Sequence, residues 1–371
     1  MARARKSSWS LTPLDLLLVA VPAAIALRYV AAWRNGALLF VVAAIAIVPL
    51  AGWMGRATEQ LAARSGSGIG GFLNATFGNA AELIIGLVAL SKGLTGVVKA
   101  SIAGSIIGNL LLVLGASILA GGLRYPKQTF NQTAARVSAT SLGLAGIALL
   151  TPTVFHVAAA GPSAGWTAAI EARLSVAIVL VLFLTYFLSL IFHLVTHREL
   201  FEGSGPTGQE DESQWPLWQS ITALAIATAF VAWLSEFLVG SIEAARHALG
   251  LSEIFVGVVV IAFVGNAAEH STAVWSAWKN KMDLSLGIAT GSSLQMALFV
   301  TPVLVLASYA FGAPMNLEFS LPEIASIIFS IWIVGKISGD GESNWFEGVQ
   351  LLALYLIIAL LFFFLPALGS P

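Results

Sequence analysis

The same five residues, Gly-Asn-Ala-Ala-Glu, occur twice in this chain, at positions 78–82 and again at 265–269. Each copy lies inside a strongly apolar stretch, where a carboxylate costs from about 2.5 to more than 10 kcal/mol depending on the reference state. Within each copy the Asn and the Glu are three residues apart, so on a helix they share one face and could hold one ligand together. The repeated pattern predicts one binding site built from four side chains: Asn79, Glu82, Asn266 and Glu269.

Further polar side chains follow each copy at helical spacing. Ser101, Ser105 and Asn109 follow the first copy in steps of four residues, and Ser292 and Gln295 follow the second copy, three residues apart. Oxygen ligands that include two carboxylates suit a hard divalent cation, Ca²⁺ before Mg²⁺, because Ca²⁺ tolerates irregular shells of oxygens. Any one of these polar residues could instead bond only to a neighbouring helix, and the glycines of both copies could serve only close helix packing. The matched recurrence favours a cation site.

The composition is that of an integral membrane protein. The chain has 371 residues, of which 58% are hydrophobic and 10% charged, with a mean hydropathy of +0.88. A soluble domain carries about 25% charged residues. The net charge of −1 gives no sign of a nucleic-acid partner, and the absence of cysteine excludes disulfides, thiolate metal sites and cysteine catalysis. We therefore expect the lipid bilayer to surround most of the chain.

The hydropathy pattern predicts an all-α polytopic protein with about eleven transmembrane helices. The apolar segments fall at about 13–31, 36–54, 69–91, 97–122, 133–157, 172–196, 216–246, 253–277, 283–311, 320–338 and 345–365. The seventh segment is too long for one crossing, so we expect it to extend into the interface. With the N-terminus inside, all but six of the 18 Lys and Arg residues fall on the cytoplasmic side, as the positive-inside rule requires.

The repeat divides the chain into two halves. Glu82 and Glu269 are 187 positions apart, as are Asn79 and Asn266, and five crossings separate the two copies. An odd interval inverts the second copy relative to the first, which is the architecture of many secondary transporters. The predicted organisation is a tail and accessory helix at 1–34, a five-helix repeat at 35–198, a loop at 199–215 and a second five-helix repeat at 216–371.

Other acidic residues lie outside the repeated motif. The loop carries Glu210, Asp211 and Glu212, and it is either a flexible connector or a cytoplasmic patch that attracts or senses the cation. Glu59 and Glu236 lie near membrane ends. Glu236, surrounded by apolar residues, could line a route for ions or could pair across a helix interface.

With both motif copies in view, the chain resembles the calcium/cation–proton exchanger family, which belongs to the wider cation/Ca²⁺ exchanger superfamily. The likeness covers nearly the whole chain, and related sodium/calcium exchangers generally carry a Pro before the motif Glu. The resemblance implies that Glu82 and Glu269 carry the cation and the protons. It further implies supporting ligands and pathway acids, the ligands being Asn79, Asn266, Ser105, Ser292 and Gln295 and the pathway acids Glu59 and Glu236.

The expected function is Ca²⁺/H⁺ antiport by alternating access, with Ca²⁺ as the transported substrate and no cofactor. Ionised Glu82 and Glu269 are tolerable in the membrane only when a cation neutralises them, so without Ca²⁺ both should take up protons. A Na⁺-coupled exchanger and an antiporter for another divalent cation such as Mn²⁺ are the alternatives. A channel or a hydrolase fits less well, and no enzyme activity is expected. We expect the protein to lie in a bacterial cytoplasmic membrane with its N-terminus inside, and it could form a homo-oligomer.

Overall fold

The computed structural model describes residues 12–30, 35–159, 168–197 and 215–365, and nearly all of them are helical. Helices that are not α are labelled η. The elements, in chain order, are η1 (Pro13–Val19), α1 (Ala20–Tyr29), α2 (Gly36–Ala62), α3 (Gly66–Phe77), α4 (Ala80–Ser91), α5 (Thr95–Ile107), η3 (Gly108–Val113), α6 (Leu114–Arg124), β1 (Gln128–Thr129), α7 (Gln132–Ala159), α8 (Ala168–Ile191), η4 (Phe192–Thr196), α9 (Leu217–Gly240), α10 (Ile242–Leu249), α11 (Glu253–Phe255), η6 (Val256–Ile261), α12 (Ala262–Trp278), α13 (Met282–Gln295), η7 (Met296–Val300), α14 (Thr301–Ala310), α15 (Leu321–Ile337), β2 (Glu342–Ser343) and α16 (Trp345–Phe364).

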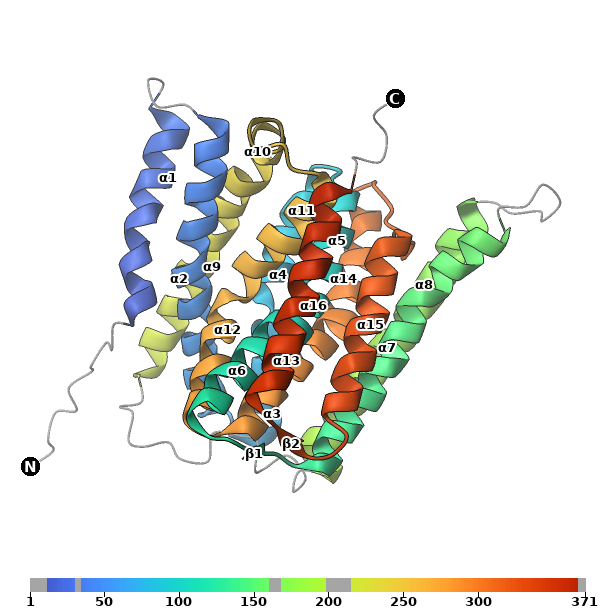
Figure 1. Cartoon of the computed structure of the whole chain (residues 1–371). Helices are drawn as coiled ribbons and strands as arrows, with labels where there is room; N and C mark the ends of the chain where they lie inside the picture. Colours follow the sequence, from blue (N-terminus) through green and yellow to red (C-terminus); the bar gives the residue numbers. More distant parts are fainter. Residues whose placement is uncertain (1–11, 31–34, 160–167, 198–214, 366–371) are drawn as a thin grey trace, which may run out of the picture.

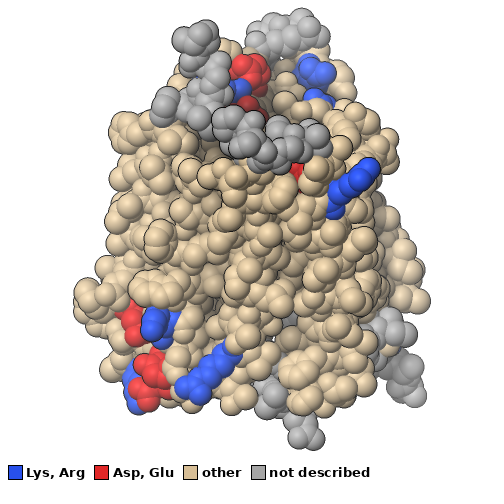
Figure 2. Space-filling model, turned by 90° about the vertical axis from the view of Figure 1, so that its right-hand side faces the viewer, with Lys and Arg blue, Asp and Glu red and all other residues tan. Residues whose placement is uncertain are grey.

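Eight helices in the described ranges are long and apolar enough to cross a membrane. Several of them are continuous runs of more than one element, such as Thr95–Arg124, which joins α5, η3 and α6. On the face shown in Figure 2, charged side chains lie toward the two ends, and a broad band between them lacks Lys, Arg, Asp and Glu. Such a band is what a bilayer requires of a surface in contact with lipid. The prediction of an all-α polytopic membrane protein is confirmed.

The count of eleven spanning helices is not confirmed, because the first, third and tenth predicted segments are not among these eight helices. The first predicted segment is a 3₁₀ turn followed by the ten-residue α1. The tenth is α15, whose 17 residues are short for a full crossing. The third is divided into α3 and α4. The long seventh segment is also divided, because α9 ends at Gly240 and the short α10 begins at Ile242.

Helices from distant parts of the chain pack against one another in the centre of the molecule. In Figure 1, α1 and α2 lie on one side and α7 and α8 on the other, with α4, α5 and α12 between them. The second and seventh predicted segments meet where α2 packs along α9, and α5 packs on η6. A two-residue antiparallel pairing of β1 with β2, which the sequence did not indicate, joins the turn after α6 to the turn before α16.

Two glycines let α5 and η6 approach to backbone contact. A Cβ atom added to Gly104 would lie 2.1 Å from the carbonyl oxygen of Val258, and one added to Gly257 would lie 2.4 Å from Cβ of Ala100. Only glycine permits such an approach, which membrane helices use because dispersion contacts there replace the hydrophobic effect. Gly291, the repeat counterpart of Gly104, has nothing within 4 Å of an added Cβ.

The variant Gly104→Ala should therefore lose stability by about 1–3 kcal/mol, because the new methyl group collides with a backbone that cannot yield. The measurement is the thermal unfolding midpoint of the purified protein in detergent. Gly291→Ala is the matched control, and it should leave the midpoint unchanged or slightly raised, since alanine favours a helix over glycine. Equal midpoints for the two variants would contradict the proposed role of Gly104.

Candidate cation-binding site

The two copies of the repeated motif have different backbones. In the first copy the helix is interrupted at Gly78 and Asn79, and α4 starts at Ala80 with Glu82 in its first turn. In the second copy, residues 265–269 lie in the uninterrupted α12. The start of α4 thus lies inside the molecule, where the partial positive charge of a helix N-terminus favours an anionic side chain. The prediction of a helical backbone in both copies is wrong for the first.

Each motif carboxylate lies against the glycine of the other copy. A Cβ atom added to Gly265 would lie 2.7 Å from Cγ and 3.4 Å from Oε1 of Glu82. A Cβ atom added to Gly78 would lie 3.5 Å from Oε1 of Glu269. The two carboxylates are also close enough for electrostatic repulsion between them. The glycines therefore make room for two acidic side chains to meet, as the repeated spacing predicts.

A network of amide and hydroxyl groups fixes the second asparagine. The Asn266 amide donates to Oγ of Ser105 at 3.1 Å and to the carbonyl oxygen of Ala262 at 2.9 Å. Its Oδ1 accepts a hydrogen bond from Asn109 at 3.2 Å and one from Ser292 at 3.3 Å. All the hydrogen-bonding capacity of the Asn266 side chain is thus in use. Asn266 acts as a rigid support at this side of the site.

Asn109 belongs to this network; the sequence placed it among the polar residues that follow the first motif copy, although the ligand set implied by the family resemblance did not include it. Its amide also donates to Oγ of Ser292 at 3.0 Å. Asn109 lies in η3, where a π-helical segment interrupts the α-helical run, and such segments are frequent at functional sites. The step of four residues from Ser105 placed both side chains on one face, which was the available signal. Ser101 bonds instead to the carbonyl oxygen of Val98, the purely structural role considered above.

The first asparagine is held differently. The Asn79 amide donates to Oε1 of Gln295, which ends α13 immediately before the π-helical η7. Oδ1 of Asn79 is buried and has no hydrogen-bond partner in the described part of the chain. The side-chain oxygen of Asn79, Oδ1, is therefore available to a ligand. The side-chain oxygen of Asn266 is not, because it already accepts two hydrogen bonds.

Four buried oxygen atoms at the site lack hydrogen-bond partners among the described residues. They are Oδ1 of Asn79, both carboxylate oxygens of Glu82 and Oε2 of Glu269. Oxygens without donors are costly in a protein interior, and ionised carboxylates are the most costly of all. Protons or a cation held by oxygens would remove this cost. The arrangement matches the preference of a hard divalent cation.

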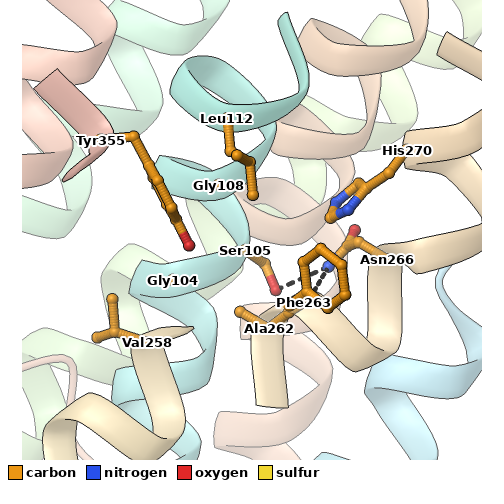
Figure 3. A pocket seen from close by; sticks show the side chains of 10 residues that line it. All are labelled: Gly104, Ser105, Gly108, Leu112, Val258, Ala262, Phe263, Asn266, His270 and Tyr355. Carbon is orange, nitrogen blue, oxygen red and sulfur yellow. Dashed lines mark hydrogen bonds between the residues drawn. The ribbon is translucent and has the colours of Figure 1, made fainter. Parts of the chain in front are cut away.

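A small pocket lies beside Asn266 (Figure 3). Ser105 and Asn266 line it together with His270 and Tyr355, which point into it from α12 and α16. The His270 ring packs against Phe263 with ring centroids 5.4 Å apart. The pocket therefore adjoins the polar network that fixes Asn266.

The other acids predicted from the sequence lie outside the two motif copies. Glu59 is exposed on α2, within electrostatic reach of Glu269. Glu236 is exposed on α9, and its backbone carbonyl accepts a hydrogen bond from Lys92 at 3.2 Å. The loop residues Glu210, Asp211 and Glu212 lie outside the described residues.

Comparison with known proteins gives consistent matches along the chain. The sequence profile of the family described as "sodium/calcium exchanger protein" matches residues 35–195 and 219–364. A protein of Synechocystis sp. named Ca²⁺/H⁺ antiporter is 46% identical over 89% of this chain and 92% of its own. A protein of Bacillus subtilis named Ca²⁺/H⁺ antiporter ChaA is 46% identical over 89% of this chain and 93% of its own. The solved structure of native YfkE superposes with a TM-score of 0.82 at 42% identity, covering 95% of this chain and all of the other.

The close fit of Glu82 against Gly265 provides a test of the site. Gly265→Ala should displace the Glu82 side chain, because the new Cβ would lie 2.7 Å from its Cγ, and divalent-cation binding should weaken at least tenfold. Equilibrium binding of radioactive Ca²⁺ to the purified protein measures the effect, and Gly291→Ala again serves as the control. Unchanged affinity in Gly265→Ala would show that Glu82 does not need its observed position.

Proposed function

Because this chain belongs to the sodium/calcium exchanger protein family, we propose that it is an antiporter that moves Ca²⁺ across a membrane in exchange for protons. The observation that carries the proposal is the meeting of Glu82 and Glu269, each against the glycine of the other motif copy. The names of the relatives from Synechocystis and Bacillus subtilis support the same activity. Ca²⁺ is the substrate in this proposal, and no cofactor takes part.

Competition at the carboxylates would couple the two ions. With Ca²⁺ bound, the ionised oxygens of Glu82 and Glu269 are neutralised, and Asn79 Oδ1 adds a further ligand. Without Ca²⁺, burial and mutual repulsion favour protonation of both carboxyl groups. An empty site with two charges is the costly state, so the protein changes conformation only when it carries one cargo or the other. Ser105, Ser292, Asn266 and Gln295 support the site from the helices beside it.

The proposal includes the arrangement of the chain in the membrane. The family profile matches two separate stretches, which supports the division into repeats at 35–198 and 216–371 joined by the loop at 199–215. Segment 1–34 would then carry the accessory helix. The distribution of Lys and Arg supports a cytoplasmic N-terminus, and the bacterial relatives support a location in the cytoplasmic membrane. In the loop, Glu210, Asp211 and Glu212 would be either a connector or a cation-attracting patch.

The decisive experiment is Ca²⁺ uptake into proteoliposomes with an imposed pH gradient. The unaltered protein should accumulate Ca²⁺ when the vesicle interior is more acidic than the bath, because protons then flow out in exchange. Glu82→Gln and Glu269→Gln should each reduce Ca²⁺ uptake to the level of vesicles without protein. Glutamine keeps the shape of the side chain but can neither ionise nor release a proton, so loss of flux reports the charge itself. Proton-coupled uptake that persists in either variant would contradict the proposed mechanism.

The same vesicles separate the alternatives. Ca²⁺ uptake that requires a Na⁺ gradient and has the same rate with and without a pH gradient would identify a Na⁺-coupled exchanger. Unlabelled Mn²⁺ that prevents Ca²⁺ uptake and is itself accumulated would identify Mn²⁺ as a second substrate. Two protons per Ca²⁺ make the exchange electroneutral, whereas a third would make it sensitive to membrane potential.

Glu59 and Glu236 would line the routes to the central site from the two sides of the membrane. Replacing either by Gln should lower the rate of uptake several-fold at low ionic strength without abolishing it, because an exposed acid raises the local cation concentration and salt screens its effect. Initial rates at low and high salt give the measurement, with Glu243→Gln on the exposed α10 as the control. A complete loss of uptake would instead place these acids in the central site.

A further inference from the structure

A second group of polar side chains lies at the ends of three helices, away from the motif carboxylates. His156 is near the end of α7, Glu171 is in the first turn of α8, and Glu318 lies shortly before α15. One ligand atom from each lies within 4.8 Å of the other two. Figure 2 shows acidic side chains at the upper end of the face on which α8 lies, beside basic ones. The proposed function uses none of the three.

The histidine ring faces a carboxylate on both sides. Nδ1 of His156 is 3.3 Å from Oε2 of Glu171, and its Nε2 is 3.3 Å from Oε1 of Glu318. A neutral imidazole carries a single N–H, so it can donate to one of these carboxylates only. The other nitrogen then directs its lone pair at a second acceptor, an arrangement that needs a positive charge between the two groups. Either a second proton or a metal ion can supply it.

The remaining oxygens of the two acids are already fixed. The Asn316 amide donates to Oε1 of Glu171 at 2.8 Å and to Oε2 of Glu318 at 3.2 Å. Lys99 in turn donates to Oδ1 of Asn316 at 2.6 Å and to the carbonyl oxygen of Glu318 at 2.7 Å. Asn316 thus turns one oxygen of each carboxylate toward His156. Such secondary hydrogen bonds orient the ligands of protein metal sites.

Several carboxylates of this group lie near a single ammonium. Lys99 lies within electrostatic reach of Glu171, Glu318 and Glu323. In the described part of the chain, these three carboxylates lie near one ammonium, so the group is rich in negative charge while His156 is neutral. The Glu171 side chain is only 4% exposed, so water compensates little of its charge. A divalent cation would be held favourably by such a group.

The donor set and the distances favour a borderline-soft ion over Ca²⁺. Imidazole nitrogen with carboxylate oxygens suits Zn²⁺ and similar transition metals, whereas Ca²⁺ and Mg²⁺ take oxygen ligands. Two ligands of a tetrahedral ion with bonds of about 2.0–2.1 Å lie about 3.3–3.4 Å apart, which is the separation of each His156 nitrogen from its carboxylate. One ion binds only one of the two ring nitrogens, so one of these contacts belongs to its shell, and the second carboxylate would move in from its position within 4.8 Å of the other ligand atoms. We propose that His156, Glu171 and Glu318 form a second cation site, selective for Zn²⁺-like ions and separate from the transport site.

The test measures binding of radioactive Zn²⁺ to the full-length protein in detergent, with Ca²⁺ in excess. The chain carries Glu82→Gln and Glu269→Gln, so that the transport site does not contribute. We expect one Zn²⁺ per chain and a rise in the thermal unfolding midpoint as Zn²⁺ is added. His156→Ala should abolish this binding, and Asn316→Ala should weaken it by about 10- to 100-fold.

Two further variants keep the test decisive. His247 and Glu243 on α10 also form a histidine–carboxylate contact, at 2.8 Å, but with no third ligand in the described part of the chain, so His247→Ala should leave Zn²⁺ binding unchanged. If His156→Ala fails to fold, Glu318→Gln removes a ligand charge from a side chain that is 32% exposed. Absence of saturable Zn²⁺ binding would overturn the proposal, as would equal binding in Glu318→Gln. A midpoint that responds to pH but not to Zn²⁺ would assign His156 to a proton instead.

Discussion

The structure depends on one constraint: two carboxylates meet where three of their four oxygens have no hydrogen-bond donor among the described residues. Both oxygens of Glu82 and one oxygen of Glu269 have no hydrogen-bond partner among the described residues, although they are buried. A folded chain tolerates this only if protons or a cation regularly occupy the site. The helix interruption at Gly78, the glycines that admit the two side chains and the π-helical segments beside Asn109 and Gln295 all serve to bring these oxygens together.

The two motif asparagines have different roles: one supports neighbouring helices and the other has an oxygen available for a ligand. Asn266 is committed to Ser105, Asn109 and Ser292, so it holds three helices in register. The Asn79 side chain donates to Gln295, and its Oδ1 has no hydrogen-bond partner among the described residues, so that oxygen is available to a ligand. The site therefore combines Asn266, which is held by its hydrogen bonds, with Asn79, which can bind a cation through Oδ1. An exchanger needs both properties, because it must recognise Ca²⁺ by its geometry and then release it.

Much of this centre could be predicted from the sequence, because membrane burial leaves few polar residues and a repeated motif identifies them. The structure brings the predicted Asn79, Glu82, Asn266 and Glu269 together with Ser105, Ser292 and Gln295. The difference between the copies could not be predicted, because the pentapeptides are identical and only packing with distant segments decides which one interrupts its helix. For the same reason, sequence spacing alone could not distinguish the tightly packed Gly104 from the open Gly291.

The unequal partners of Asn79 and Asn266 have a consequence for the evolution of such a chain. Two identical half-length subunits related by a two-fold axis would give both asparagines the same neighbours, so neither could become a support while the other stayed available. Joining the halves in one polypeptide removes that restriction, since each copy can then change its flanking residues independently. In the two-repeat organisation proposed above, the different roles of Asn79 and Asn266 therefore depend on both motif copies lying in one asymmetric polypeptide.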